Sequence, residues 1–181
     1  MKNLVLVLSL LSFAASAGEL KGVKMADSTT VDGKSLKLQG MGLRSKAFIK
    51  VYVAGLYLEN ASDNADKIIG SDSVRRVEMS MMRDLGKDKI VSAIHDGVEK
   101  NSKDKMSALK ERLDKFTAAI PDLKEGQVMS ITYVPGKGTT VKGASAEMTV
   151  PGKDFADAVF LVWLGKDPVD DDLKAGMLGA K

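Results

Sequence analysis

An apolar run from Lys46 to Leu58, with the sequence KAFIKVYVAGLYL, constrains the fold most strongly. Successive side chains of a strand point to opposite faces of its sheet, and here both sets are largely apolar. This pattern is typical of a central strand that is covered on both sides. Lys50 and Tyr52 share one face, where a cation and a phenol are unexpected in a core. The run therefore predicts a buried strand that also carries a polar feature.

The rest of the chain alternates between strand and helix patterns. Strands are predicted over 18–43, as a hairpin that turns at Val31 to Lys34, and over 74–82, 128–134 and 139–150. Single helices are predicted over 60–70, over 155–164 and after Pro168. An amphipathic pair of helices is predicted before Pro121, with a break between its two members at 101–104. Strands and helices in this order indicate an α+β domain, with an antiparallel sheet backed by helices.

The N-terminus has the organisation of a secretory signal peptide. Lys2 is followed by the apolar residues 4–13 and then by Ala15-Ser16-Ala17, the small-x-small pattern that signal peptidase recognises. The apolar run is shorter than the roughly 20 residues of a membrane span, and no later segment is long enough to span a bilayer after signal cleavage. We therefore expect a cleaved signal peptide over 1–17, a single domain over 18–181 and a periplasmic location. An uncleaved N-terminal anchor is the alternative.

Composition argues against several classes of function. The chain has no cysteine, which excludes disulfides and zinc–thiolate sites. It has one histidine, His95, so a transition-metal site is not indicated, and no cofactor is expected. The 27 basic and 24 acidic residues are scattered without an arginine-rich stripe, so nucleic-acid binding is not indicated. No G-x-S-x-G motif supports triad hydrolysis.

Arg44 and Tyr52 are the polar residues of most interest around the apolar run. One interpretation places both at the end of an apolar cleft, where a guanidinium and a phenol hold a carboxylate or a phenolate. The other interpretation places Lys50 and Tyr52 near a sheet edge, with the lysine extending to water. The residue pattern alone leaves both interpretations open.

The same stretch resembles the strand signature of the chalcone isomerase superfamily. Gly42-Leu43-Arg44 and the run 50–59, KVYVAGLYLE, are similar to the G-x-R and K-F-T-x-x-G-V-Y-L-E of the plant enzymes. The segments 82–84, 132–136, 138–140 and 162–168 are similar to the secreted bacterial chalcone isomerase-like proteins. This resemblance implies an open-faced β-sandwich, in which a large antiparallel sheet carries a layer of helices on one face and has a smaller sheet element beside it.

The resemblance does not carry the enzyme's activity with it. In the plant enzymes an arginine stabilises the attacking phenolate, and a threonine, a tyrosine, an asparagine and a second threonine complete the site. Arg44 matches the arginine, but the other positions hold Tyr52, Lys89, Asp96 and, approximately, Val162. Most of the catalytic set is replaced, so the substrate ketone would lack its polarising donors.

A non-catalytic branch of the same superfamily binds fatty acids through an arginine and a tyrosine, and Arg44 with Tyr52 resembles that pair. This predicts an exported protein that binds a small amphipathic anion, such as a fatty acid, in a cleft between sheet and helices. The candidate ligand-binding residues are Arg44, Tyr52, Lys50, Lys89, Asp96 and Val162. Two alternatives remain open. One is an intramolecular lyase or isomerase that acts on a chalcone-like phenolic enone, with Arg44 as a catalytic residue. The other is a structural or partner-binding module with a filled pocket.

Overall fold

A computed structural model describes residues 17–180 of the chain. The predicted signal peptide lies outside the described residues, except for Ala17. These residues form a two-stranded hairpin of β1 (Ala17–Leu20) and β2 (Val23–Ala26). They also form a seven-stranded antiparallel sheet with its strands in chain order: β3 (Ser28–Val31), β4 (Lys34–Lys46), β5 (Ile49–Leu58), β6 (Arg75–Met81), β7 (Val128–Val134), β8 (Gly138–Lys142) and β9 (Glu147–Val150). The helices are α1 (Ala65–Gly70), α2 (Lys87–Ser102), α3 (Met106–Ala118), α4 (Lys153–Leu164) and α5 (Asp171–Met177).

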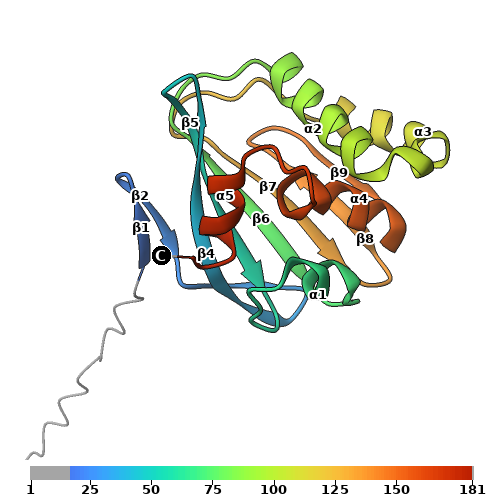
Figure 1. Cartoon of the computed structure of the whole chain (residues 1–181), viewed down its shortest axis with the longest axis horizontal. Coiled ribbons are helices and arrows are strands. Elements are labelled where there is room, and N and C mark those ends of the chain that lie inside the picture. The colour runs from blue at the N-terminus through green and yellow to red at the C-terminus, as the bar shows by residue number, and fades with distance from the viewer. Residues whose placement is uncertain (1–16, 181) are drawn as a thin grey trace, which may run out of the picture.

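The large sheet curls around a layer of helices, as Figure 1 shows. α4 packs against α2 and α3, and α5 packs against β4. The β1–β2 hairpin lies against β4 on the other side of the sheet. The α+β prediction is confirmed, with an antiparallel sheet, a layer of helices and a smaller sheet element. No helix within residues 17–180 combines the length and apolar character that crossing a membrane requires.

The core follows from alternation along the central strands. On β6, Val77, Met79 and Met81 are buried against the helices, while the intervening side chains are partly exposed. β5 is buried on both faces, because Tyr52 joins the helix-side core while Tyr57 packs with Leu36 under the second face. Two-sided burial of this segment is therefore confirmed, and it explains why almost every residue of the strand is apolar.

Small residues let α5 lie directly on β4. A Cβ at Gly42 would stand 2.2 Å from the carbonyl oxygen of Leu173. A Cβ at Gly176 would stand 2.5 Å from the carbonyl oxygen of Met41. Because no side chain separates the two backbones, α5 and the residue that caps it, Asp170, are held close to the middle of β4.

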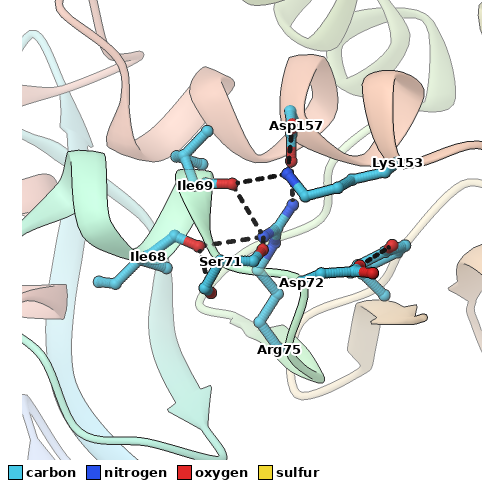
Figure 2. A network of polar contacts seen from close by, with 8 residues as sticks. Ile68, Ile69, Ser71, Asp72, Arg75, Lys153 and Asp157 are labelled. Carbon is cyan, nitrogen blue, oxygen red and sulfur yellow. Dashed lines mark hydrogen bonds and ion pairs between the residues drawn. The ribbon is translucent and has the colours of Figure 1, made fainter.

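A buried cation ties α1, β6 and α4 together, as Figure 2 shows. Arg75 is 1 % exposed, and its Nη2 donates to Oδ1 of Asp157 at 2.6 Å. Its Nη1 donates to the carbonyl oxygens of Ile68 and Ser71 at the end of α1. Lys153 donates to the second carboxylate oxygen of Asp157 at 2.7 Å. The network hydrogen-bonds carbonyl oxygens at the end of α1, a position where carbonyls have no partner within their own helix.

Two predicted strands are wrong in extent. The segment 46–58 is not one strand, because the chain reverses at Ala47 and Phe48 between β4 and β5. The segment 139–150 is likewise divided into β8 and β9 by a turn over 143–146. The predicted hairpin over 18–43 comprises two hairpins, and the first of them belongs to the separate two-stranded sheet. The turn at 47–48 contains no glycine, proline or asparagine, so no local signal marked it.

Candidate functional site

The β4–β5 hairpin places Arg44 directly opposite Tyr52. The two residues are cross-strand partners in the register of the pair, and the side chains of directly opposed residues lie on the same face of a sheet. Val51 is an extra residue of β5, because Ser45 pairs with Lys50 rather than with Val51. This irregularity breaks the alternation beyond Tyr52 and changes the direction of Lys50.

A cavity of about 910 Å³ lies between this end of the sheet and the helices α2 and α4. Its volume falls within the roughly 300–1,000 Å³ of small-molecule sites. The apolar part of its wall includes Val51, Met79, Met81, Ile90, Ile94 and Met129. Three of these six are methionines, whose flexible side chains adapt to ligands of irregular shape. The wall suits an apolar chain.

A second, smaller cavity of about 370 Å³ lies beside α1. It is lined mainly by the loop 59–63 and by polar residues such as Lys67 and Ser71. Its volume and its polar wall make it a poorer candidate for an apolar ligand.

Arg44 lines the large cavity and is already paired. Its Nη1 donates to Oδ2 of Asp170 at 2.9 Å and to the carbonyl oxygen of Ser45 at 2.9 Å. The side chains of Arg44 and Asp170 are 21 % and 16 % exposed. Among residues 17–180, nothing accepts a hydrogen bond from Nε or Nη2 of Arg44. The guanidinium therefore keeps donors for a further acceptor, but its charge is offset by Asp170.

Tyr52 forms the second polar group of the cavity wall. Its Oη accepts a hydrogen bond of 3.2 Å from Nε1 of Trp163, because the indole nitrogen can only donate. Its own hydroxyl hydrogen has no acceptor in the described part of the chain, so it can be donated to a ligand. Burial raises the pKa of Tyr52 to about 12, so the phenol is a neutral donor at neutral pH.

The structure brings five of the six candidate residues to one cavity: Arg44, Tyr52, Lys89, Asp96 and Val162. Val162 is buried, whereas Lys89 and Asp96 are exposed on α2. Lys50 does not line the cavity and is exposed beside the turn of the hairpin.

Sequence reasoning missed two residues of the site. Asp170 belongs to the helix predicted after Pro168 and Trp163 to the helix predicted over 155–164, and neither was among the candidate site residues. Asp170 instead reaches Arg44, and Trp163 reaches Tyr52, over separations of 126 and 111 residues. The periodicity of a short segment cannot predict contacts between residues so far apart in the chain. The one available signal is that a buried arginine requires an acidic neighbour or a ligand.

Charges of both signs surround the cavity. The basic residues Lys46, Arg83 and Lys100 line it together with the acidic residues Asp84 and Asp88. The hydrogen bond from Lys124 to Asp84, 2.8 Å long, lowers the pKa of that carboxyl. The wall can thus hold a polar head group at its rim and an apolar body inside.

Comparison with known proteins identifies the fold and the family of the chain. No curated protein sequence matches the chain. Among solved structures, the crystal structure of the Arabidopsis thaliana fatty-acid binding protein AtFAP1 matches with a TM-score of 0.69 and 17 % sequence identity, over 90 % of this chain and 96 % of that one. The family model described as chalcone isomerase-like matches residues 17–179. The chain therefore belongs to the chalcone isomerase-like family.

Proposed function

We propose that this protein is an exported, non-catalytic binding protein that holds a small amphipathic anion, such as a fatty acid, between its sheet and helices. The observation that carries the proposal is the cavity of about 910 Å³, which combines an apolar inner wall of methionines and isoleucines with polar residues that include Arg44 and Tyr52. Ligand sites typically combine such a wall with a few placed polar groups.

The head group would lie against the two free donors of the β4–β5 hairpin. Nη2 of Arg44 and the hydroxyl of Tyr52 belong to opposed residues of neighbouring strands, so they can donate to one carboxylate. Charge-assisted hydrogen bonds of this kind are stronger than neutral ones. The apolar tail would lie along the methionines and isoleucines of the inner wall.

Asp170 lowers the net attraction of the site for an anion. Its carboxylate already holds Nη1 of Arg44 at 2.9 Å, so a ligand carboxylate adds a second negative charge beside the same guanidinium. The site is therefore expected to bind a fatty acid largely through its tail, with the head group fixing its orientation.

The fold similarity supports the choice of ligand class. AtFAP1 is a fatty-acid binding protein by name and has the same fold over nearly its whole length. Export rests on the signal-peptide pattern of residues 1–17. N-terminal sequencing of the protein from the periplasmic fraction should begin at Gly18, and an intact Met1 in the membrane fraction would contradict export with cleavage.

Titration with a fluorescent long-chain fatty acid tests the binding function. Wild type and Lys50→Ala should bind alike, because Lys50 lies outside the cavity. Arg44→Ala should weaken binding. Tyr52→Phe should weaken it by about 1.5–3 kcal/mol, which is the usual contribution of a hydrogen bond to a charged group. If wild type does not bind, or if neither cavity variant differs from Lys50→Ala, the proposed site is wrong and a partner-binding module becomes the better interpretation.

A further inference from the structure

The turn between β4 and β5 carries the most exposed large apolar side chain of the described residues. Phe48 has a relative exposure of 104 %, and the next residue, Ile49, is 49 % exposed. Lys46 and Lys50 flank the pair and are also exposed. We call residues 46–50, with the sequence KAFIK, the apolar tip. Phe48 takes no part in the core, so its presence has no explanation in the packing of this chain.

The backbone of the apolar tip is unfavourable for its sequence. Ala47 and Phe48 have φ angles of 48° and 67°, in the left-handed region that residues with a Cβ avoid. The other turns of the described chain with two successive positive φ angles contain Lys21-Gly22 and Asp32-Gly33. Glycine at the second position suits this geometry, and Ala-Phe does not. The hairpin thus carries a protruding phenylalanine where a glycine would make the turn more stable.

The apolar tip also borders the ligand cavity. Lys46, Ala47 and Ile49 belong to its wall. In Figure 1 the β4–β5 turn lies at the top of the view, at the end of the sheet where α2 begins and away from α1. Residues of the α2 start, Asp88 and Lys89, line the same cavity. The tip is therefore part of the mouth of the cavity.

We propose that the apolar tip inserts into the surface of an anionic lipid bilayer and directs the mouth of the cavity toward it. An aromatic and an aliphatic side chain would enter the interfacial region, while Lys46 and Lys50 would contact anionic head groups. A single convex turn is too small for a stable protein interface, which buries roughly 1,200 Å² or more. A bilayer, by contrast, accepts one protruding apolar wedge with cations beside it.

Such docking would give the proposed ligand a direct path between bilayer and cavity. An amphipathic molecule could then pass along Ile49 and Val51, both of which line the cavity, without crossing bulk water. This consequence rests on the proposed function, whereas the docking itself does not. Binding to vesicles is measured without a fatty-acid ligand, so the docking proposal and the ligand-binding proposal can be contradicted independently of each other.

Sedimentation of the full chain with vesicles tests the docking. The vesicles are phosphatidylcholine alone, or phosphatidylcholine mixed with phosphatidylglycerol. Wild type should bind the mixed vesicles, and Phe48→Ser should bind them about ten-fold more weakly. The double variant Lys46→Gln/Lys50→Gln should bind the mixed vesicles more weakly than wild type, by about five-fold for each lysine removed. Its affinity for phosphatidylcholine vesicles should not change, because they carry no net charge. Met148→Ser is the matched control, because Met148 is 38 % exposed on β9, outside the tip, and it should bind as wild type.

A single dye reports which part of the chain meets the lipid. The sequence has no cysteine, so Ile49→Cys and Lys137→Cys each provide one labelling site for an environment-sensitive fluorophore. Emission from position 49 should rise and shift to the blue on adding mixed vesicles. Emission from position 137, in the turn after β7, should not change.

Three results would overturn the proposal. One is a wild-type chain that stays in solution, and another is a Phe48→Ser variant that binds as tightly as wild type. The third is a dimer in analytical ultracentrifugation that depends on Phe48 while no vesicles bind, which would assign the tip to a second copy of the chain. Phe48 is fully exposed, so its replacement leaves the fold intact and each result can be interpreted.

Discussion

Arg44 and Asp170 form an ion pair of 2.9 Å between Nη1 and Oδ2, although 126 residues separate them in the chain. The other oxygen of Asp170, Oδ1, accepts from the backbone nitrogen of Leu173 at 2.9 Å and caps α5. One carboxylate therefore begins a helix and also offsets the cation of the cavity wall. The pair makes the docking of α5 and the charge of the cavity depend on each other.

Asp170→Asn should bind a fluorescent fatty acid more tightly than wild type, by about ten-fold or about 1.4 kcal/mol. The substitution removes the negative charge that competes for Arg44, and asparagine still caps α5 because it is as good a cap as aspartate. Titration against wild type, with Arg44→Ala expected to change in the opposite direction, measures this. Equal or weaker binding by Asp170→Asn would show that Arg44 does not receive the ligand carboxylate.

The free energy of unfolding of Asp170→Asn provides a second test of the ion pair. Without ligand, Asp170→Asn leaves Arg44 with no counter-ion, which should cost about 1–3 kcal/mol of unfolding free energy, less than a fully buried pair because both side chains are partly exposed. Added fatty acid should recover part of this loss, since a ligand that binds only the folded state stabilises it.

Stability at alkaline pH should depend on Tyr52. Burial raises the pKa of Tyr52 from 10.0 to about 12. The folded chain holds this proton more tightly than the unfolded chain, so the contribution is fully present below pH 10 and is lost as pH rises through about 12. Urea unfolding over this range should show a smaller loss in Tyr52→Phe, by up to about 3 kcal/mol. Tyr57 and Tyr133, whose pKa values are also about 12, should keep part of the effect in that variant. If wild type and Tyr52→Phe lose the same unfolding free energy over this pH range, the raised pKa of Tyr52 is contradicted.

Chalcone cyclisation by the purified protein should remain near the rate in buffer. Lys89 and Asp96 are exposed on α2, and Val162 offers no donor, so a substrate ketone would find few polarising groups besides Tyr52. Each missing oxyanion-type donor typically costs about 10²–10³ in rate. The decay of chalcone absorbance measures this, with Arg44→Ala as the control. A rate well above buffer that Arg44→Ala abolishes would restore the isomerase interpretation.

Much of the fold could be predicted because the deciding signals are local. Apolar residues on both faces of 46–58 predicted the central strand, and an amphipathic pattern predicted the helix pair in which α2 buries Ile90, Ile94 and Val98. The reversal at Ala47 and Phe48 could not be predicted, since both residues take left-handed angles that their side chains disfavour. Residue propensities cannot predict a turn whose residues disfavour the backbone angles that it requires.

The site could be predicted only in part, for a related reason. Arg44 and Tyr52 lie eight residues apart on one hairpin, so a strand pattern could suggest that they share a face. Their partners, Asp170 and Trp163, come from the last part of the chain and reach them through the packing of α4 and α5. Lys50 is exposed, and the irregularity at Val51 interrupts the alternation that would place it on the face of Tyr52.

Gly42→Ala should separate α5 from β4. The new methyl group would stand 2.2 Å from the carbonyl oxygen of Leu173, and a backbone atom cannot yield as a flexible side chain can. We expect a loss of about 2–3 kcal/mol of unfolding free energy, as for overpacking in a core. Gly70→Ala is the control, since no atom lies within 4 Å of a Cβ at that position. Thermal unfolding of both variants checks the prediction, and equal midpoints would contradict the close packing.

Arg75→Met should be the most destabilising of these substitutions, at about 3–5 kcal/mol. Its guanidinium lies 4.8 Å from the ring centre of Phe160 and 4.9 Å from that of Tyr133, and it is 1 % exposed. Removing it takes one donor from the carbonyls of Ile68 and Ser71 at the end of α1, and breaking one side of a buried pair costs about this much. Arg75→Lys should recover little, because an ammonium cannot stack on the two rings and reach Asp157 with the same fork.

The neighbouring residue Arg76 makes the Arg75 experiment specific. Arg76 pairs with Glu78 at 2.7 Å, but both side chains are 23 % exposed, so Arg76→Met should cost about 1 kcal/mol or less. Urea unfolding measures the two variants under the same conditions. Asp157→Asn should approach Arg75→Met in cost, because it leaves Arg75 and Lys153 together without an anion. If Arg75→Met and Arg76→Met prove equally stable, the network of Figure 2 does not hold α1 and α4 to the sheet.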